Sequence, residues 1–286
     1  MSPPRTVTLF TRRRTALTPP AVTRVAQLAA EADVELRIPV EEVEKHELTD
    51  LPGNAVLGCA ADEPTDLALV LGGDGTILST MRTFIGRKVP VFAINFGTIG
   101  FLATAERDDL DDGIRRALRG EFDVLALPAL TVSAGGHEHV GINDLSFHRR
   151  QNLRVAELGY SVVGEQLGEV RSDGLVVSTP AGSTGYNLAN GGPVLAWGVE
   201  GYVVSFIAPH TLTARALVVA PDDVLQVVNR SPDEPVDIMT DGRSVSTLGP
   251  QERAEVRFDH DMAFLAQAPD ASFYHRLREK FGRLSH

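Results

Sequence analysis

The sequence predicts a two-domain protein in which a doubly wound, Rossmann-like α/β domain is followed by an all-β, β-sandwich-like domain. Strand-like and helix-like segments alternate up to Gly120, which favours a parallel sheet covered by helices. Beyond Gly120, short strand-like runs follow one another with turn residues between them, which is typical of an all-β domain. We expect the domains to cover residues 1–120 together with 268–286, and residues 121–267.

The elements of the first domain are predicted from apolar runs and from apolar periodicity. The run LALVL (67–71) is continuously apolar and ends in glycines, as a buried parallel strand does. Prolines near its start favour a helix at 19–32, and an acidic start with a basic end suits a helix at 106–119. The expected strands are 7–10, 34–38, 67–71 and 90–95, and the expected helices are 19–32, 76–85 and 106–119.

The second domain is expected to consist of strands, because turn residues separate its apolar runs at short intervals. After it, residues 271–284 have the apolar spacing of an amphipathic helix, which we expect to return and pack on the first domain. The expected strands are 129–134, 139–147, 157–163, 174–179, 202–208, 224–229, 235–240 and 254–258.

Composition excludes several classes of function. The net charge is −11, whereas a protein that wraps nucleic acid normally has a basic surface. The single cysteine, Cys59, rules out a disulfide within the chain and cysteine-rich metal sites, and it suits a reducing compartment. His137 and His139 lie in a Gly-rich turn without a third ligand at metal-site spacing, so no metal centre built by the protein alone is expected. No signal peptide and no apolar run near ~18 residues is present, so we expect a cytoplasmic protein with no membrane or nucleic-acid partner.

The segment LGGDGT (71–76) lies at a predicted strand-to-helix turn, where open α/β sheets bind ligands. Glycines let the backbone approach a phosphate, and the helix N-terminus offers free N–H groups. A carboxylate opposes bound anions, so Asp74 is expected to accept a proton from an attacking hydroxyl or to hold Mg²⁺. The alternative is a plain turn in which Asp74 is the helix N-cap. The expected phosphate cradle consists of Gly72, Gly73, Gly75 and Thr76.

Two further segments follow strands at the same edge of the predicted sheet. They are the triple arginine Arg12, Arg13 and Arg14, and the stretch NFGTIGF (95–101). The arginines would compensate phosphate charge at the strand ends. A solvated loop cluster is an equally good interpretation of such a charge run.

Polar residues of the second domain suggest a site for a nucleoside. The stretch SDGLVVSTPAGSTGY (172–186) runs from a strand into a turn rich in small hydroxyls and backbone donors, which suits a base and ribose hydroxyls. The alternative is a long β connection, since the same residues dominate turns. Asn143 and Asp144 are neighbours inside the predicted strand 139–147, where adjacent side chains point to opposite faces. A strand end or bulge at this pair is the alternative, and the residues alone favour it.

Several of these segments together resemble the signature blocks of the NAD kinases. GGDGT alone is also found in diacylglycerol-type lipid kinases and resembles a phosphofructokinase loop, but the combination is highly specific. The resemblance covers roughly residues 66–245. It implies an enzyme that phosphorylates the 2′-hydroxyl of the adenosine ribose of NAD to give NADP, using ATP or polyphosphate. The matching blocks are LGGDGT (71–76), NFGTIGFL (95–102), IND (142–144), SDGLVVSTPAGSTGYNLANGGP (172–193) and APHTLTARALV (208–218).

The resemblance also implies roles for individual residues. Asp74 matches the general base of the family, and Phe101 with Leu102 matches an element that lies against the adenine. Asn143 and Asp144 match an Asn-Glu pair that binds the ribose. The implied NAD-binding residues are Asp74, Gly75, Phe101, Asn143, Asp144, Arg154, Arg171, Asp173, Thr184, Gly185, Tyr186, Asn187 and Arg243.

The sequence differs from the family pattern at three positions within the matching blocks. Asp144 stands where Glu is usual, Ala181 where Thr is frequent, and Gly185 where Ala is frequent. These changes bear on affinity and on the choice between NAD and NADH rather than on the class of reaction. The resemblance does not assign a role to His210 of the PHTL element.

The implied cofactor is Mg²⁺, or another divalent metal, bound mainly through the donor phosphates. The implied partners are NAD and a phosphoryl donor, and the resemblance suggests a homodimer or homotetramer. Two other functions remain: a GGDGT-type lipid kinase and a catalytically silent NAD-binding sensor. The acidic charge argues against the first, which would need an apolar or basic surface to reach membranes. The intact Asp74 argues against the second.

Overall fold

The computed structural model describes residues 2–12, 17–97, 100–150, 154–269 and 271–282. It divides the chain into two compact units, Met1–Ala126 with Ala263–His286, and Leu127–Met262. The sequence analysis placed the boundaries after residues 120 and 267. The difference arises because two long strands, β7 (Asp123–Ala134) and β18 (Arg253–Gln267), run through both boundaries.

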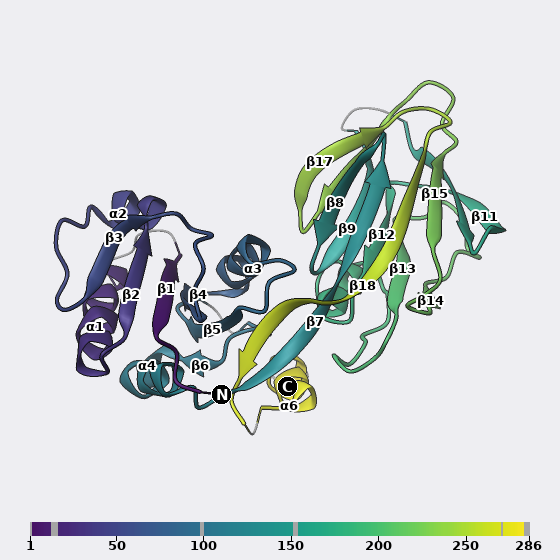
Figure 1. The fold of residues 1–286 in the computed structure, drawn as a ribbon. Helices are drawn as coiled ribbons and strands as arrows, with labels where there is room; N and C mark the ends of the chain where they lie inside the picture. The colour runs from purple at the N-terminus through teal and green to yellow at the C-terminus, as the bar shows by residue number, and fades with distance from the viewer. Residues whose placement is uncertain (1, 13–16, 98–99, 151–153, 270, 283–286) are drawn as a thin grey trace. The chain divides into compact units, whose positions relative to one another are not determined.

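Unit 1 contains a parallel sheet in the order β5-β4-β1-β2-β3 (Figure 1). The apolar runs expected to be strands form its centre, and β4 and β5 are buried along their whole length. The C-terminal part of β18 joins the sheet beside β5, where Phe264 pairs with Pro90. The strands are β1 (Thr6–Thr11), β2 (Glu35–Pro39), β3 (Ala55–Cys59), β4 (Leu67–Gly72), β5 (Pro90–Asn95) and the short β6 (Ala105–Glu106).

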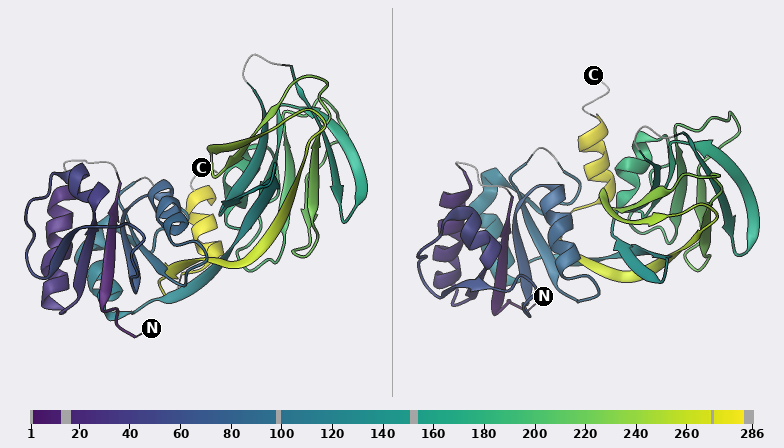
Figure 2. Two further views of the ribbon diagram at one scale, coloured as in Figure 1. Left: turned by 45° about the horizontal axis from the view of Figure 1, so that its top comes forward. Right: turned by 90° about the horizontal axis from the view of Figure 1, so that it is seen from above.

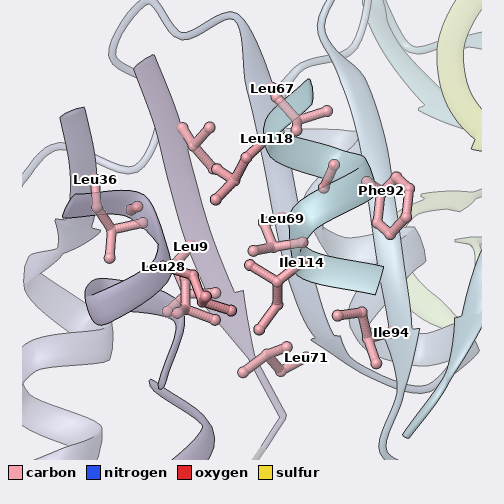
Figure 3. Close-up of a cluster of buried hydrophobic side chains, with 14 of the residues drawn as sticks. Leu9, Leu28, Leu36, Leu67, Leu69, Leu71, Phe92, Ile94, Ile114 and Leu118 are labelled. Atoms are coloured by element: carbon pink, nitrogen blue, oxygen red, sulfur yellow. The ribbon is translucent and has the colours of Figure 1, made fainter. Parts of the chain in front are cut away.

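Helices cover both faces of this sheet. Leu9, Leu69 and Ile94 point from one face toward Leu28 of α1 and Ile114 of α4 (Figure 3). On the other face, the Phe10 ring meets the Phe84 ring, which directly follows α3, edge-on at 5.9 Å. The doubly wound arrangement predicted from the sequence is thereby confirmed. The helices of this unit are α1 (Thr18–Glu31), α2 (Val40–His46), α3 (Asp74–Thr83), η1 (Arg107–Asp109), α4 (Leu110–Arg119) and α6 (Phe273–Phe281).

The parallel register brings three strand ends together. Thr11 of β1 pairs with Leu71 of β4, and Gly72 of β4 pairs with Asn95 of β5. The segments that follow these three strands therefore start at one edge of the sheet, as the sequence analysis expected.

Unit 2 is a β-sandwich. One sheet has the order β14-β13-β12-β9-β16-β17, and the other contains β11-β10-β15-β18 with β7 and β8 (Figure 1). Inward side chains of both sheets, among them Phe147, Val177, Leu225 and Val256, form one buried core. The elements are β7 and β18, with β8 (His137–Gly141), β9 (Asp144–Arg149), β10 (Ala156–Val162), β11 (Glu165–Ser172), β12 (Gly174–Ser178), η2 (Gly182–Thr184), α5 (Tyr186–Ala189), β13 (Tyr202–Ile207), β14 (Leu217–Val219), β15 (Leu225–Asn229), β16 (Val236–Thr240) and β17 (Arg243–Leu248).

The expectation of one strand over 139–147 is wrong. The chain leaves β8 at Gly141 and enters β9 at Asp144. Between them, the main-chain N–H groups of Ile142 and Asn143 donate to the carboxylate of Asp241 instead of to a neighbouring strand. The alternative interpretation of the Asn143–Asp144 pair, a strand end, is the correct one.

Four strands of at least three residues were not predicted, namely β3, β11, β14 and β17. Each of them lies at the edge of its sheet. The strands β11 and β17 are rich in polar residues and lack the apolar run used to recognise the central strands. The strands β3 and β14 have short apolar sequences, AVLGC and LVV, that the sequence analysis did not interpret as strands. The helix α2, the short β6 and the short helices η2 and α5 were also missed.

The C-terminal segment returns to unit 1, as expected. In Figure 2, α6, drawn in yellow, follows β18 in the chain. The Phe273 ring of α6 stacks on Phe101 with 6.5 Å between ring centroids. Within the part of the chain that the structure describes, no helix combines the length and the apolar character needed to cross a membrane.

Candidate active site

Asp74 is the first residue of α3, directly after the extended N-cap residue Gly73. The interpretation of Asp74 as the helix N-cap is therefore wrong. Its carboxylate turns to the loop after β5, where Oδ2 accepts the N–H of Phe101 at 2.9 Å and Oδ1 accepts the N–H of Leu102 at 3.1 Å. Each oxygen keeps a further lone pair, so the group can still accept a proton.

Two glycines around Asp74 are required by close packing. A Cβ on Gly100 would lie 2.1 Å from Asp74 Oδ1, and a Cβ on Gly72 would lie 2.6 Å from Thr76 Cβ. Gly72 is buried, and its carbonyl accepts the N–H of Phe96 at 3.1 Å. Of the predicted cradle, Gly73, Gly75 and Thr76 line an open hollow, whereas Gly72 lies behind them.

The hollow has a volume of about 820 Å³, within the range of small-molecule sites. Three cationic side chains and one carboxylate, Asp74, face it. This combination of charges suits a polyanionic ligand whose negative groups contact the cations and whose hydroxyl group contacts the Asp74 carboxylate. The described residues that line it are Arg12, Leu17, Gly73, Asp74, Gly75, Thr76, Phe96, Gly97, Gly100, Arg107 and Lys280.

Arg12 is tied to the strand ends. Its N–H donates to the Leu71 carbonyl at 2.9 Å, and its guanidinium donates to the Phe96 carbonyl. The first arginine of the triplet therefore belongs to the hollow. Arg13 and Arg14 lie outside the described residues, as do Thr98 and Ile99 of the segment 95–101.

The Phe101 ring is buried against α6. Its ring centroid lies 6.5 Å from that of Phe273 and 6.0 Å from that of Phe281, and Lys280 Nζ lies 4.4 Å from the Phe101 centroid. The structure thus gives Phe101 a packing role in addition to the hydrogen bond from its N–H to Asp74.

A second polar group lies in unit 2, around the start of β9. The Asp241 carboxylate accepts three main-chain N–H groups, from Ile142 at 3.2 Å, Asn143 at 2.7 Å and Asp144 at 3.3 Å. Burial, and next the charge of Asp241, raises the pKa of Asp144 to about 7. Near neutral pH, Asp144 is therefore partly protonated and can donate a hydrogen bond. The Oδ1 atom of Asn143 is buried and has no hydrogen-bond partner among the described residues.

The turn after β12 packs on this group. Thr179 Oγ1 donates to the Ile142 carbonyl at 2.7 Å and accepts the Gly182 N–H at 3.1 Å. A Cβ on Gly182 would lie 2.0 Å from the Asn143 carbonyl oxygen, which explains the glycine. The TPAGST stretch is thereby fixed against the main chain of Asn143.

The residues that follow this turn differ in exposure. Asn187 is fully buried, and its Nδ2 donates to the carbonyls of Ser183 at 3.0 Å and Pro193 at 2.9 Å, so it holds the turn closed. Tyr186 is partly exposed and stacks on His148, with centroids 5.7 Å apart and an interplanar angle of 6°. Burial, and then the charges of Asp144 and Asp173, raises the pKa of Tyr186.

The remaining predicted residues lie at both ends of this sheet and in the turn after β12. Arg243 starts β17 and pairs with Thr240, so it lies at the same end of the sheet as Asp241. Asp173 lies at the opposite end of β12, where it forms an ion pair with Arg149. Arg154 and Arg171 are exposed, and Arg171 Nε lies 3.1 Å from a Glu157 carboxylate oxygen. Thr184 is half-buried and Gly185 is exposed, while the N–H of the exposed His210 donates to the Arg171 carbonyl at 2.8 Å.

Sequence reasoning missed three residues of these groups: Arg107 and Lys280 of unit 1 and Asp241 of unit 2. It also missed Arg276, whose guanidinium donates to the carbonyl of Phe101 at 2.9 Å. The Asp241-Gly242 dipeptide is typical of a hairpin turn, and this explains the residue from the sequence alone. The sequence does not show that the Asp241 carboxylate also accepts the N–H groups of residues 142–144. Arg276 and Lys280 belong to the predicted C-terminal helix, but helical spacing alone does not show which loop that helix reaches.

The described residues contain no group of three or more His, Cys, Asp or Glu side chains that could hold a metal ion. His137 and His139, which the sequence analysis placed in a Gly-rich turn, lie in β8, where Glu138 forms an ion pair with Arg257. In the hollow, Asp74 is the one carboxylate among the described lining residues.

Comparison with known proteins gives consistent matches along the chain. Residues 21–122 match the ATP-NAD kinase N-terminal domain, and residues 142–264 match the ATP-NAD kinase C-terminal domain. The chain is 35% identical to the NAD kinase of Gemmatimonas aurantiaca over 229 residues, which covers 77% of this chain and 78% of that protein. It is 36% identical to the NAD kinase of Nitrosomonas eutropha over 222 residues, covering 76% and 75% of the two chains.

Solved structures show the same fold. Yeast NADH kinase complexed with NADH superposes with a TM-score of 0.88 at 21% identity, covering 100% of this chain and 89% of that one. An NAD kinase from Archaeoglobus fulgidus in complex with ATP gives a TM-score of 0.74 at 22% identity, covering 98% of each chain.

Proposed function

Because the chain belongs to the ATP-NAD kinase family, we propose that it phosphorylates the 2′-hydroxyl of the adenosine ribose of NAD to give NADP, with Asp74 as general base. The observation that carries this proposal is the Asp74 carboxylate, held by two N–H donors at the edge of a hollow that three cations line. The acceptor is taken from the NAD kinases to which the chain is similar.

In the proposed reaction, the ribose 2′-oxygen forms a bond to the terminal phosphorus of the donor as the bond from that phosphorus to the leaving phosphate oxygen breaks. The hydroxyl proton passes to Asp74. Arg12, Arg107 and Lys280 offset the negative charge of the phosphates. The donor we propose is ATP, on the likeness to a kinase solved with ATP, with polyphosphate as the alternative.

Unit 2 supplies groups suited to a nucleoside. The buried Oδ1 of Asn143 can accept a hydrogen bond, and the protonated form of Asp144 can donate one. The partly exposed Tyr186 ring offers a flat surface on which a base can stack. We retain the further predicted contacts in the proposal: Gly75, Phe101, Arg154, Arg171, Asp173, Thr184, Gly185, Asn187 and Arg243.

The residues present fit a magnesium ion that is bound mainly through phosphates. One carboxylate faces the hollow, and Mg²⁺ commonly uses one or two carboxylates together with substrate phosphates. Asp74 would hold it, and the bound ion would neutralise charge on the donor phosphates.

We further propose that the enzyme is a cytoplasmic homodimer or homotetramer. The single cysteine and the expectation of a reducing compartment support the location. Light scattering of the eluted protein during size-exclusion chromatography tests the assembly, and a monomer at micromolar concentration would refute it.

The decisive experiment measures NADP formed from NAD, Mg²⁺ and either ATP or polyphosphate. Asp74→Asn keeps the side-chain shape but removes the base, so we expect kcat to fall by about 10²- to 10⁴-fold, with NAD binding retained in calorimetry. Asp33→Asn, at an exposed residue of the same unit that does not line the hollow, is the matched control and should retain activity. A wild type that binds NAD tightly but makes no NADP with either donor would replace the kinase with an NAD-binding sensor.

A further inference from the structure

The orientation of the Asp74 carboxylate depends on the loop after β5. Both carboxylate oxygens accept N–H groups of that loop, from Phe101 and Leu102. Gly100 is so close that a Cβ there would overlap Asp74 Oδ1. A displacement of this loop therefore displaces or releases the carboxylate.

The same loop is held from its other side by α6. The Arg276 guanidinium donates to the Phe101 carbonyl at 2.9 Å and to the Ala103 carbonyl, and it also donates to Gln267 Oε1 at 3.0 Å. Phe101 is thus fixed at both main-chain polar groups, its N–H by Asp74 and its carbonyl by Arg276.

Arg276 makes these bonds from a half-buried position. Burial lowers the pKa of Arg276, and the Asp74 charge is the largest of the effects that oppose this. Burying a guanidinium costs free energy unless hydrogen bonds compensate it, and an apolar side chain would fill the same space more cheaply. Three oxygen acceptors on two separate segments are the compensation here, and two of them belong to the loop that orients Asp74.

We propose that Arg276 is a positioning residue for the catalytic carboxylate: it fixes the loop 100–103 so that the N–H groups of Phe101 and Leu102 stay aimed at Asp74. The inference rests on the proposed function, because it assigns a purpose to the orientation of that base. Arg276 acts through the loop and does not touch the reacting atoms.

The kinetic test compares Arg276→Met, which keeps the length of the apolar stem and removes all donors, with Arg276→Lys, which restores a cation. We expect Arg276→Met to lower kcat by about 10- to 100-fold, as small misplacements of catalytic groups do, with KM for NAD within about twofold, and Arg276→Lys to recover part of the loss. Arg278→Met is the matched control, since Arg278 is exposed on the same helix and contacts His275. An equal loss in Arg278→Met, or a rise in KM without a fall in kcat, would overturn the proposal.

A double variant shows whether Arg276 acts through Asp74. In the Asp74→Asn background, Arg276→Met should cost less than about twofold in residual kcat, because coupled residues are not additive. A loss as large as in the wild-type background would mean that Arg276 serves another purpose.

A third measurement does not require activity and separates this inference from the proposed function. Amide hydrogen exchange followed by NMR should show the Phe101 and Leu102 amides exchanging at least about tenfold faster in Arg276→Met, as expected when a local opening becomes easier. The amide of Val70 in the buried strand β4 should keep its protection. If the exchange rates of the Phe101 and Leu102 amides are unchanged, or if protection is lost throughout β4, Arg276 does not position this loop. This result is independent of whether the protein is a kinase or an NAD-binding sensor.

Discussion

Replacing Asp144 with asparagine should stabilise unit 2 in a pH-dependent way. The pKa of Asp144 is about 7 in the folded protein, against an ordinary value of 3.8 for an aspartate side chain. A raised carboxyl pKa means that the folded state binds this proton more tightly than the unfolded state, so stability is lost as pH rises from about 4 to about 7. Above pH 7, the raised pKa of Asp144 lowers the free energy of unfolding by on the order of 4 kcal/mol, since one pKa unit corresponds to about 1.4 kcal/mol. Asparagine has the same shape and never carries this charge.

The gain in stability from Asp144→Asn should therefore increase by about 3 kcal/mol between pH 5 and pH 8.5. Urea unfolding followed by the fluorescence of Trp197, the single tryptophan, reports on unit 2, to which that residue belongs. Asp222→Asn removes an exposed charge from the same unit and serves as the control. Parallel stability curves for the wild type and Asp144→Asn across this pH range would refute the reasoning.

Three further predictions follow from close contacts. Gly100→Ala should lower kcat by about 10-fold or more, because the added Cβ would overlap Asp74 Oδ1 and displace that carboxylate. Gly198→Ala, where the added Cβ meets open space, is the control in the same NADP assay. Gly182→Ala should destabilise unit 2 by about 2 kcal/mol, because the Cβ would collide with the Asn143 carbonyl; an unchanged urea midpoint would contradict this. Tyr202→Phe removes the 2.6 Å hydrogen bond to the Asp223 carbonyl and should cost about 1 kcal/mol, measured by the same unfolding assay.

The parts of the fold that the sequence predicts are those with a local signal. The run LALVL marks a central strand because both of its faces are buried, and the glycines after it mark the turn that carries Asp74. Edge strands such as β17 lack this signal because one side of each lacks a neighbouring strand. The break at Asn143 was predictable only as an alternative, because its cause is a carboxylate 98 positions away in the sequence.

The candidate site also has local and non-local parts. Asp74 and its glycines form a compact motif, so the sequence alone places them together at a strand-to-helix turn. The contacts of Arg276 join α6 to a loop 175 residues earlier in the sequence, as its bond to Phe101 shows. No local pattern encodes such a pairing, and only the folded chain reveals it.

The discontinuity of unit 1 has a consequence for biosynthesis. The ribosome completes β1, β4 and α3 long before it reaches Arg276, because the whole of Leu127–Met262 is translated in between. A nascent chain therefore contains Asp74 before it contains Arg276, and the last segment of unit 1 is made only after the whole of unit 2. Chains released early by ribosome stalling would carry the LGGDGT segment but lack Arg276, so the carbonyls of Phe101 and Ala103 would lack their hydrogen bonds to that side chain.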